Sequence, residues 1–583
     1  MTKKEGNMKS IWAESLDPSA PLQEYPRMQL KRESWTNLNG IWEYQIVPKG
    51  QNTQKDDWKP VCVPFPVGSS LSMAEEIVQP DEVLWYRRTF SYKPEGGRTI
   101  LNFEAVDQIC SVYVNGEEVG RHAGGYTPFQ IDITDKVKYQ NSLMVKVVDA
   151  SDTGVLAFGK QRLKTDTIWY TPVAGIWGTV WLEEYPTYYV EDIKITPDFD
   201  ESRAFIELAG AFGQAKITVK AKDNSFFHQG ITTDGHYVVP MQGFHPWSPE
   251  DPFLYDVEIQ TEDDFVTSYF GMRKFSSGKD GNGYTRFFLN NKPLFLSGVL
   301  DQGYNVDGVY TYPSEGAMLY ELQTMKSMGF NMLRKHVKVE CRRWYYLCDT
   351  LGMLVMQDMP NGGSTFSCLY HQALPLFLNI RTLSDKKYAR FGRSAKLSRD
   401  MYMHELDEML DTLFNCTCIF AWVPFNEGWG QFDSARITKH IAEYDTTRLI
   451  DSASGWHDQG CGDFNSRHVY FHNFHVPKPD NRILLLSEFG GYSYAEASHC
   501  QVKKVFGYKK FSDKVDLSRA ISEVYDTDVV QNISKGLSGC IYTQLSDVET
   551  ECNGILTADR KVIKIDPKKM KQINERIYRR FNK

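Results

Sequence analysis

The sequence lacks the features that would place the protein in a membrane, on a nucleic acid or in a disulfide-bonded scaffold. No apolar run approaches the roughly 18 residues of a membrane-spanning helix. The 66 Lys and Arg residues are mixed with 74 Asp and Glu residues, for a net charge of −8, so no basic stripe is available to bind nucleic acid. The 11 cysteines are an odd number without a framework spacing, which indicates buried thiols such as Cys62, Cys110 and Cys540.

The first seven residues are polar and lack the apolar stretch of a signal peptide. We therefore expect a cytoplasmic protein, unless a leader was removed from the sequence.

Motifs for metal and cofactor chemistry are also missing. Cys416 and Cys418 have no second matched pair, which a zinc site would need. The segment from His404 to Glu408 nearly matches the helical zinc-protease motif, but Glu408 stands where the second histidine must be. There is no nucleophile elbow and no glycine-rich phosphate loop. We expect no metal and no cofactor, and neither a serine hydrolase nor a nucleotide-binding protein.

The sequence has 583 residues, a length that predicts about two to four domains. The periodicity of its apolar residues changes along the chain. In residues 1–186, short alternating runs recur between turn signals such as Asn115-Gly116, which predicts a jelly roll. Residues 187–277 contain further short strands, and their number suits an immunoglobulin-like sandwich. In residues 278–583 strands alternate with helices, and the pattern predicts a strand at 469–472 and a single long helix at 518–535. This alternation predicts a (β/α)8 barrel with its chemistry at the C-terminal strand ends.

Two glutamates end apolar, strand-like runs in this last part of the chain. Glu427 follows residues 421–425, and Glu488 follows residues 483–486 and precedes two glycines. Each alone has an ordinary explanation, Glu427 as a helix-start residue stabilised by the helix dipole and Glu488 as the buried partner of an arginine. Together, at the ends of two barrel strands, they indicate a carboxylate pair that cleaves a glycosidic bond.

Motifs spread over nearly the whole chain carry a family resemblance. They are WTNLNGIW (residues 35–42), WYRR (85–88), VYVNG (112–116), WSPEDP (247–252), GFNMLR (329–334), NE (426–427) and SEFG (487–490). The first three resemble the sugar-binding domain of glycoside hydrolase family 2, the fourth resembles its immunoglobulin-like module, and the last three resemble its barrel. Members include β-galactosidases, β-glucuronidases and β-mannosidases, and many self-associate, so a homo-oligomer is left open.

The resemblance implies a role for each glutamate, and the chemistry agrees with it. Glu427 is then the acid/base after the fourth strand, and Glu488 the nucleophile after the seventh. A retaining glycosidase needs carboxyls roughly 5–5.5 Å apart, with the pKa of Glu427 raised and Glu488 ionised. Arg334 is the family's cation beside the nucleophile, with a structural salt bridge as the alternative. Asn426 is expected to hydrogen-bond the sugar 2-hydroxyl.

Other residues near the predicted strand ends are further candidates for the pocket. Many family members have a histidine-containing stretch where this chain has Asp301. His472-Asn473-Phe474 resembles the family's His-x-Tyr segment, and with Phe in place of Tyr we expect the hydroxyl that orients the nucleophile to be absent. The remaining candidates are His336, Asp358, Asp547 and Glu549, together with four rings that stack on sugars or simply pack, Trp429, Trp456, Tyr492 and Tyr542.

We predict a retaining exo-acting β-glycosidase, whose substrate is a glycoside or oligosaccharide. Galactose, glucuronate and mannose differ by one hydroxyl or a carboxylate, so the sequence does not identify the sugar. A β-galactoside is the leading prediction, with β-glucuronide and β-mannoside as alternatives, and Lys335 and Lys338 keep a uronate open. A non-catalytic carbohydrate-binding protein is the alternative from another class, and the presence of both carboxylates argues against it.

Overall fold

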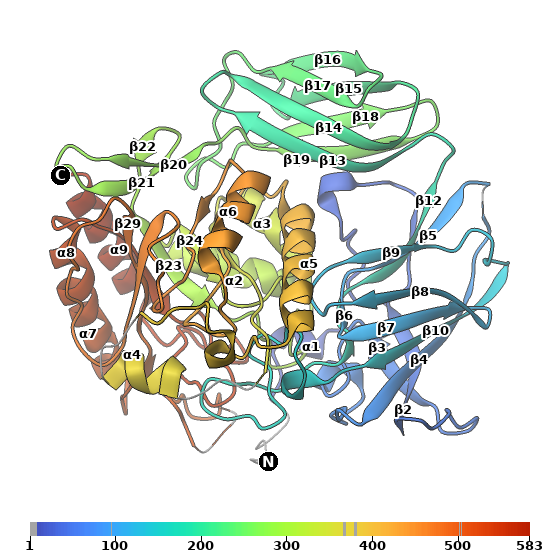
Figure 1. The fold of residues 1–583 in the computed structure, drawn as a ribbon, viewed down its shortest axis with the longest axis horizontal. Coiled ribbons are helices and arrows are strands. Elements are labelled where there is room, and N and C mark those ends of the chain that lie inside the picture. Colours follow the sequence, from blue (N-terminus) through green and yellow to red (C-terminus); the bar gives the residue numbers. More distant parts are fainter. Residues whose placement is uncertain (1–7, 95, 365–368, 378–381, 501, 503) are drawn as a thin grey trace.

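The protein is described by a computed structural model that covers residues 8–94, 96–364, 369–377, 382–500, 502 and 504–583. The first seven residues, on which the prediction about a leader rests, lie outside these ranges. Three parts follow one another along the chain: two β-sandwiches and a barrel of parallel strands surrounded by helices (Figure 1). The predicted jelly roll, immunoglobulin-like and (β/α)8 architecture is confirmed.

The N-terminal domain packs a six-stranded sheet against a four-stranded one. Strand β2 shows why, because its buried and outward-facing residues alternate and so give it one apolar face. The predicted turn is confirmed, since Asn115 and Gly116 have φ of 53° and 87° and join β7 to β8. The sheets contain β3 (Lys59–Val63), β2 (Gly40–Pro48), β4 (Glu82–Ser91), β10 (Gln140–Val148), β7 (Ile109–Val114) and β8 (Glu117–Ala123), and β1 (Trp35–Asn37), β12 (Val180–Tyr185), β5 (Arg98–Phe103) and β9 (Phe129–Asp132); β6 (Val106–Asp107) pairs with β11 (Gly175–Ile176).

The second domain is a small sandwich of three and four antiparallel strands, which lies against the barrel (Figure 1). Trp247 anchors it there: this side chain is fully buried, and its indole Nε1 donates to the carbonyl oxygen of Asp349 at 2.8 Å. The strands are β13 (Tyr189–Asp198), β14 (Arg203–Ala211) and β17 (His236–Pro240), and β16 (Phe227–Thr232), β15 (Ala215–Ala221), β18 (Tyr255–Gln260) and β19 (Phe265–Phe270); a short sheet of β20 (Phe275–Lys279), β21 (Thr285–Leu289) and β22 (Lys292–Pro293) follows.

The barrel has eight parallel strands in the order β27-β26-β25-β24-β23-β32-β29-β28. The backbone N–H of Asp463, just before β28, donates to Ile450 O in β27 at 2.7 Å, which joins the two end strands. Strands β23 to β27 and β29 and β32 are buried along their whole length, as expected for strands covered on both faces. The strands are β23 (Leu296–Asp301), β24 (Met332–Lys335), β25 (Leu354–Asp358), β26 (Ile419–Val423), β27 (Leu449–Ile450), β28 (Phe464–Val469), β29 (Ile483–Gly490) and β32 (Leu537–Thr543).

Helices surround this barrel, and two elements differ from the prediction. The strand expected at 469–472 is β28, which ends at Val469. The single helix expected at 518–535 is interrupted by a π-helical segment, Tyr525–Val530. Among the described residues, no helix has the length and apolar character needed to cross a membrane. The helices are α1 (Ile11–Glu14), α2 (Glu315–Ser327), α3 (Arg342–Leu351), α4 (Leu374–Phe377), α5 (Lys396–Leu413), α6 (Ser434–Tyr444), α7 (Lys514–Val524), α8 (Gln531–Ile533) and α9 (Pro567–Phe581); β30 (Tyr492–Ser493) pairs with β31 (Lys509–Lys510).

Trp247→Ala is expected to lower the free energy of unfolding by about 3–5 kcal/mol, because it opens a large cavity at the domain junction and removes the bond to Asp349. Urea denaturation followed by tryptophan fluorescence and by far-UV circular dichroism checks this. The control is Tyr139→Ala, since Tyr139 is 67% exposed. Equal stability of the two variants would contradict the anchoring role.

Candidate active site

Glu427 is held at the mouth of the barrel by an unusual backbone conformation. Strand β26 ends at Val423, and the chain continues beside the segment that follows β27, where Glu427 N donates to Ser454 O at 3.0 Å. Glu427 has φ of +50°, in the left-handed region that costs a non-glycine residue about 1 kcal/mol or more. The surrounding hydrogen bonds thus hold the backbone of Glu427 in a strained conformation, and Glu427 carries one of the two carboxylates that the sequence singled out.

Glu488 occupies the C-terminal part of β29. The register of β29 against β32 shifts between Leu486 and Phe489, so the strand is irregular at the glutamate. Gly490 follows with φ of +84°, and a Cβ there would lie 2.4 Å from the ring of Tyr542. The glycine is therefore required for a close approach, and Glu488 is left 4% exposed within the barrel.

The two carboxylates meet at His468, the penultimate residue of β28. One oxygen of Glu427, one ring nitrogen of His468 and one oxygen of Glu488 all lie within 4.8 Å of one another. The Nδ1 atom of His468 is 2.8 Å from Glu427 Oε1 and 3.4 Å from Glu488 Oε2. This separation suits direct attack by one carboxylate better than the wider gap that admits a water between the two.

Arg334, in β24, joins the strand ends. Its Nε and Nη2 atoms donate to the two oxygens of Asp358 at 2.9 Å each, and Nη2 also donates to Asn426 Oδ1 at 2.8 Å. Its Nη1 atom lies 3.2 Å from Glu488 Oε1. Asp358 Oδ2 in turn accepts from Nδ1 of His336 at 2.9 Å. Five of the predicted site residues, Arg334, His336, Asp358, Asn426 and Glu488, are thus brought together in one network.

The surroundings of the two glutamates shift their pKa values to different extents. Burial, and then the charge of Glu488, raise the pKa of Glu427 well above its ordinary value. Burial also raises the pKa of Glu488, but the guanidinium of Arg334 and the hydroxyl of Tyr470 oppose that rise. These opposing contacts act on Glu488, so its surroundings favour the ionised carboxylate more than the surroundings of Glu427 do.

A tyrosine hydroxyl at the second glutamate corrects one expectation. Tyr470 donates to Glu488 Oε2 and lies 3.0 Å from Thr543 Oγ1, so the hydroxyl expected to be absent is present. The segment was misplaced because β28 ends at Val469; His472 and Asn473 therefore lie beyond the strand and are exposed. His468-Val469-Tyr470 has the same His-x-Tyr pattern, and this signal could have been found in the sequence.

Two of the predicted rings lie beside the network. The ring centroid of Trp456 is 5.5 Å from that of His468, and Trp429 is 6.2 Å from His336. Both tryptophans are buried, so each forms part of the wall around the carboxylates.

The other predicted site residues have structural partners. Tyr542 packs in the core against Phe489 and Tyr525, and Tyr492 packs against Phe511. Polar members are engaged too: Asp301 Oδ2 binds Lys335 Nζ at 2.7 Å, Asp547 Oδ1 binds Lys564 Nζ at 2.6 Å, and Glu549 Oε1 accepts from Thr171 N at 2.9 Å. The sequence pattern locates strand ends but does not reveal which neighbours neutralise the charges there.

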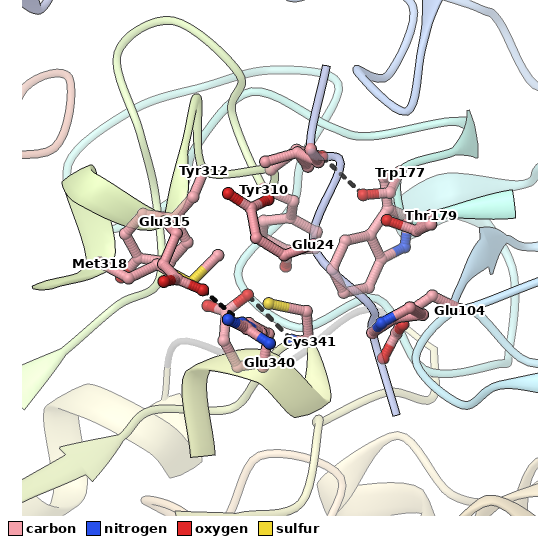
Figure 2. A pocket seen from close by; sticks show the side chains of 15 residues that line it. Glu24, Glu104, Trp177, Thr179, Tyr310, Tyr312, Glu315, Met318, Glu340 and Cys341 are labelled. Atoms are coloured by element: carbon pink, nitrogen blue, oxygen red, sulfur yellow. Dashed lines mark hydrogen bonds and ion pairs between the residues drawn. The ribbon is translucent and has the colours of Figure 1, made fainter. Parts of the chain in front are cut away.

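A separate pocket lies where the N-terminal domain meets α2 and α3 (Figure 2). Trp177 and Glu104 line it from the first domain, and Glu315 and Met318 from α2. Glu315 and Arg343 both line it and form an ion pair. No member of the carboxylate pair lines it, so we assign no chemistry to this pocket.

Comparison with known proteins identifies the family. The sugar-binding domain of glycosyl hydrolases family 2 matches residues 31–186, the model described as glycosyl hydrolases family 2 matches 188–273, and the family's TIM barrel domain matches 283–577. The chain belongs to this family, as the motifs indicated.

Individual relatives carry different names. A β-galactosidase of Thermoanaerobacter pseudethanolicus is 23% identical over 73% of this chain and 56% of its own length. A putative β-glucuronidase of Formosa agariphila is 30% identical over 64% of this chain and 34% of its own length. The chain thus spans between a third and about half of these two relatives. A solved β-glucuronidase from an uncultured Clostridium has the same fold, with a TM-score of 0.73 at 17% identity over 95% of this chain and 99% of that one.

Asp301→Ala is expected to lower the free energy of unfolding by about 3 kcal/mol, the lower end of the range for a broken buried pair, because Glu340 still neutralises Lys335. Thermal denaturation checks this. Adding Lys335→Met should restore most of the lost stability by removing the buried charge. A variant with unchanged stability but a raised KM would instead make Asp301 a substrate contact.

Proposed function

We propose that the protein is a retaining exo-β-glycosidase. The observation that carries the proposal is the carboxylate pair, two buried glutamates within 4.8 Å of each other's oxygens and in unequal electrostatic surroundings. Both glutamates are nearly enclosed, at 9% and 4% exposure, which suits a pocket for one terminal sugar better than an open groove. In this proposal Glu488 attacks the anomeric carbon, while the proton held by Glu427 passes to the leaving oxygen.

The second half of the reaction uses the same groups in reverse. Once the leaving group has departed with the proton, Glu427 is ionised and can take a proton from the incoming water, which hydrolyses the glycosyl ester on Glu488. Arg334 and Tyr470 both contact Glu488, and they stabilise this carboxylate when it is released. Asn426 Nδ2 is buried and has no hydrogen-bond partner among the described residues, so it is available to donate to the sugar 2-hydroxyl.

For the substrate, a β-galactoside is the first compound to test, with a β-glucuronide and a β-mannoside as alternatives. Relatives of this chain are named as β-galactosidase and as β-glucuronidase, so names alone do not choose between them. A carbohydrate-binding protein without activity is the competing class, and hydrolysis of any aryl β-glycoside excludes it.

Glu488→Ala is expected to abolish turnover of aryl β-glycosides, because no other group can form the covalent intermediate. In Glu427→Ala, Glu488 should still attack substrates with good leaving groups. Turnover should be slowed most on substrates with poor leaving groups, because these need the proton. The measurement is kcat over a series of aryl leaving groups, together with the anomeric configuration of the first product by NMR. Full activity in Glu488→Gln, or a product of inverted configuration, would contradict the mechanism.

Tyr470→Phe is expected to lower kcat about 100-fold, as the loss of a preorganised donor does in other sites. It should also raise the pKa of Glu488 further, because the hydroxyl opposes that rise. Activity requires ionised Glu488 and is lost as the pH falls through its pKa. The acidic limb of the kcat/KM profile therefore moves to higher pH.

The matched control for this profile is Tyr525→Phe. Tyr525 is fully buried, and its hydroxyl has no partner in the described part of the chain. Identical profiles for the two variants would remove Tyr470 from the mechanism.

A further inference from the structure

A loop of the N-terminal domain reaches the barrel mouth and carries a buried lysine there. The N–H groups of Phe158 and Gly159 donate to Asn361 O at 2.9 and 3.1 Å, and Asn361 closely follows β25. Gly159 has φ of +59°, and a Cβ on it would lie 2.7 Å from the hydroxyl of Tyr126. The next residue is Lys160, which is 5% exposed. Its position is therefore fixed by contacts with the barrel as well as with its own domain.

The ammonium of Lys160 lies among groups of the candidate active site. Its Nζ is 5.8 Å from the ring centroid of Trp429, two residues after Glu427. Its charge opposes the rise in pKa that burial and neighbouring charge cause at Glu427 and that burial causes at Glu488. Lys160 thus acts electrostatically on both carboxylates, although it belongs to another domain.

Lys160 has a carboxylate opposite it, but at a distance that leaves its donors largely unused. Its Nζ is 3.8 Å from Glu551 Oε2 and 3.5 Å from the hydroxyl of Tyr170. Glu551 is 2% exposed, and Tyr170 donates to the same Oε2. An ammonium this deeply buried normally makes closer contacts.

The two structural pairs near the barrel strands show the difference. Lys335 is 2.7 Å from Asp301, and Lys564 is 2.6 Å from Asp547. The longer gap at Lys160 is not what a purely structural ion pair would leave.

We propose that Lys160 and Glu551 together read the hydroxyl groups of the sugar, and that this charge-balanced pair selects a neutral sugar over a uronic acid. Lys160 donates to one hydroxyl oxygen, and Glu551 accepts from a neighbouring hydroxyl. The inference rests on the proposed glycosidase function and adds the substrate class. It concerns a contact supplied by the N-terminal domain, outside the catalytic pair.

The charges around the pocket support the neutral class. Arg334 is already bound by Asp358 and Glu488. Lys335 and Lys338, which the sequence left open as partners of a uronate, are fully buried and both bind Glu340, at 3.1 and 2.8 Å. A uronate carboxylate would therefore compete with Glu551 for Lys160 and would be repelled by Glu551. Sugar hydroxyls, in contrast, can hydrogen-bond to both members of the pair.

The test compares aryl β-galactoside, β-glucoside and β-mannoside with aryl β-glucuronide and β-galacturonide. Wild type should show kcat/KM at least about 100-fold higher for its best neutral substrate than for either uronide. Lys160→Met should lower the neutral kcat/KM by about 10- to 100-fold, the loss of a charged hydrogen bond, and should move both limbs of the pH profile upward. Glu551→Gln should reduce the ratio of kcat/KM for neutral substrates to kcat/KM for the uronides.

Lys164→Met is the control, since Lys164 is exposed on the same loop, and it should leave all these values unchanged. Preference for a uronide, or a Lys160→Met variant that is altered in thermal stability but not in kcat/KM or pH profile, would overturn the inference.

If no glycoside of the panel is cleaved, the proposed function fails separately from the inference. Calorimetric titration of wild type with D-galactose, D-glucose, D-mannose and D-galacturonate then decides. Binding of a neutral sugar that weakens about tenfold or more in Lys160→Met would uphold the inference. Absence of Lys160-dependent binding would overturn it.

Discussion

A guanidinium that is completely removed from water organises the candidate active site. Arg334 is fully buried, and a buried charge is tolerated only when it is paired and its donors are used. Its partners come from three elements: Asp358 ends β25, Asn426 follows β26, and Glu488 lies in β29. Placing these acceptors correctly therefore fixes the relative positions of three strand ends. A lysine could not do this, because only the planar fork of arginine binds a carboxylate bidentately while reaching two further acceptors.

The same strand shows how the barrel separates chemistry from stability. Successive residues of a strand point to opposite faces, so Lys335 points away from the site that Arg334 enters. Its Nζ lies 3.9 Å from the ring centroid of Trp344 in α3 and binds Asp301 and Glu340. Two adjacent buried cations thus serve different purposes: Arg334 pairs with Glu488, and Lys335 connects the strands to the helical layer. This alternation explains why Asp301, a strand-end carboxylate like Asp358, lies outside the network.

The sequence was sufficient for the architecture and for placing the two glutamates at strand ends, because both depend on the periodicity of apolar residues and on where apolar runs end. It failed where the outcome depended on a strand boundary or on distant partners. Tyr470 was missed because β28 ends at Val469, three residues earlier than the predicted strand. Asp547 was a candidate for the pocket because it follows β32, and the sequence did not show that its Oδ1 binds Lys564, from further along the chain. The pairing of Lys160 with Glu551 joins two domains, and no local pattern reports such a contact.

This last contact changes the role of the N-terminal domain. In a barrel of this kind the catalytic groups come from strand ends, and specificity comes from the loops around them. Here one such loop belongs to another domain and is held at the barrel mouth by backbone hydrogen bonds to Asn361. The barrel alone would retain Arg334 and both glutamates but would lose the ammonium that faces Glu551. Glu551 would then be a buried carboxylate without a cation, close enough to raise the pKa of Glu427 further. The N-terminal domain therefore lowers the pKa of Glu427 through Lys160, and the two domains must dock before the carboxylate pair acquires its final electrostatics.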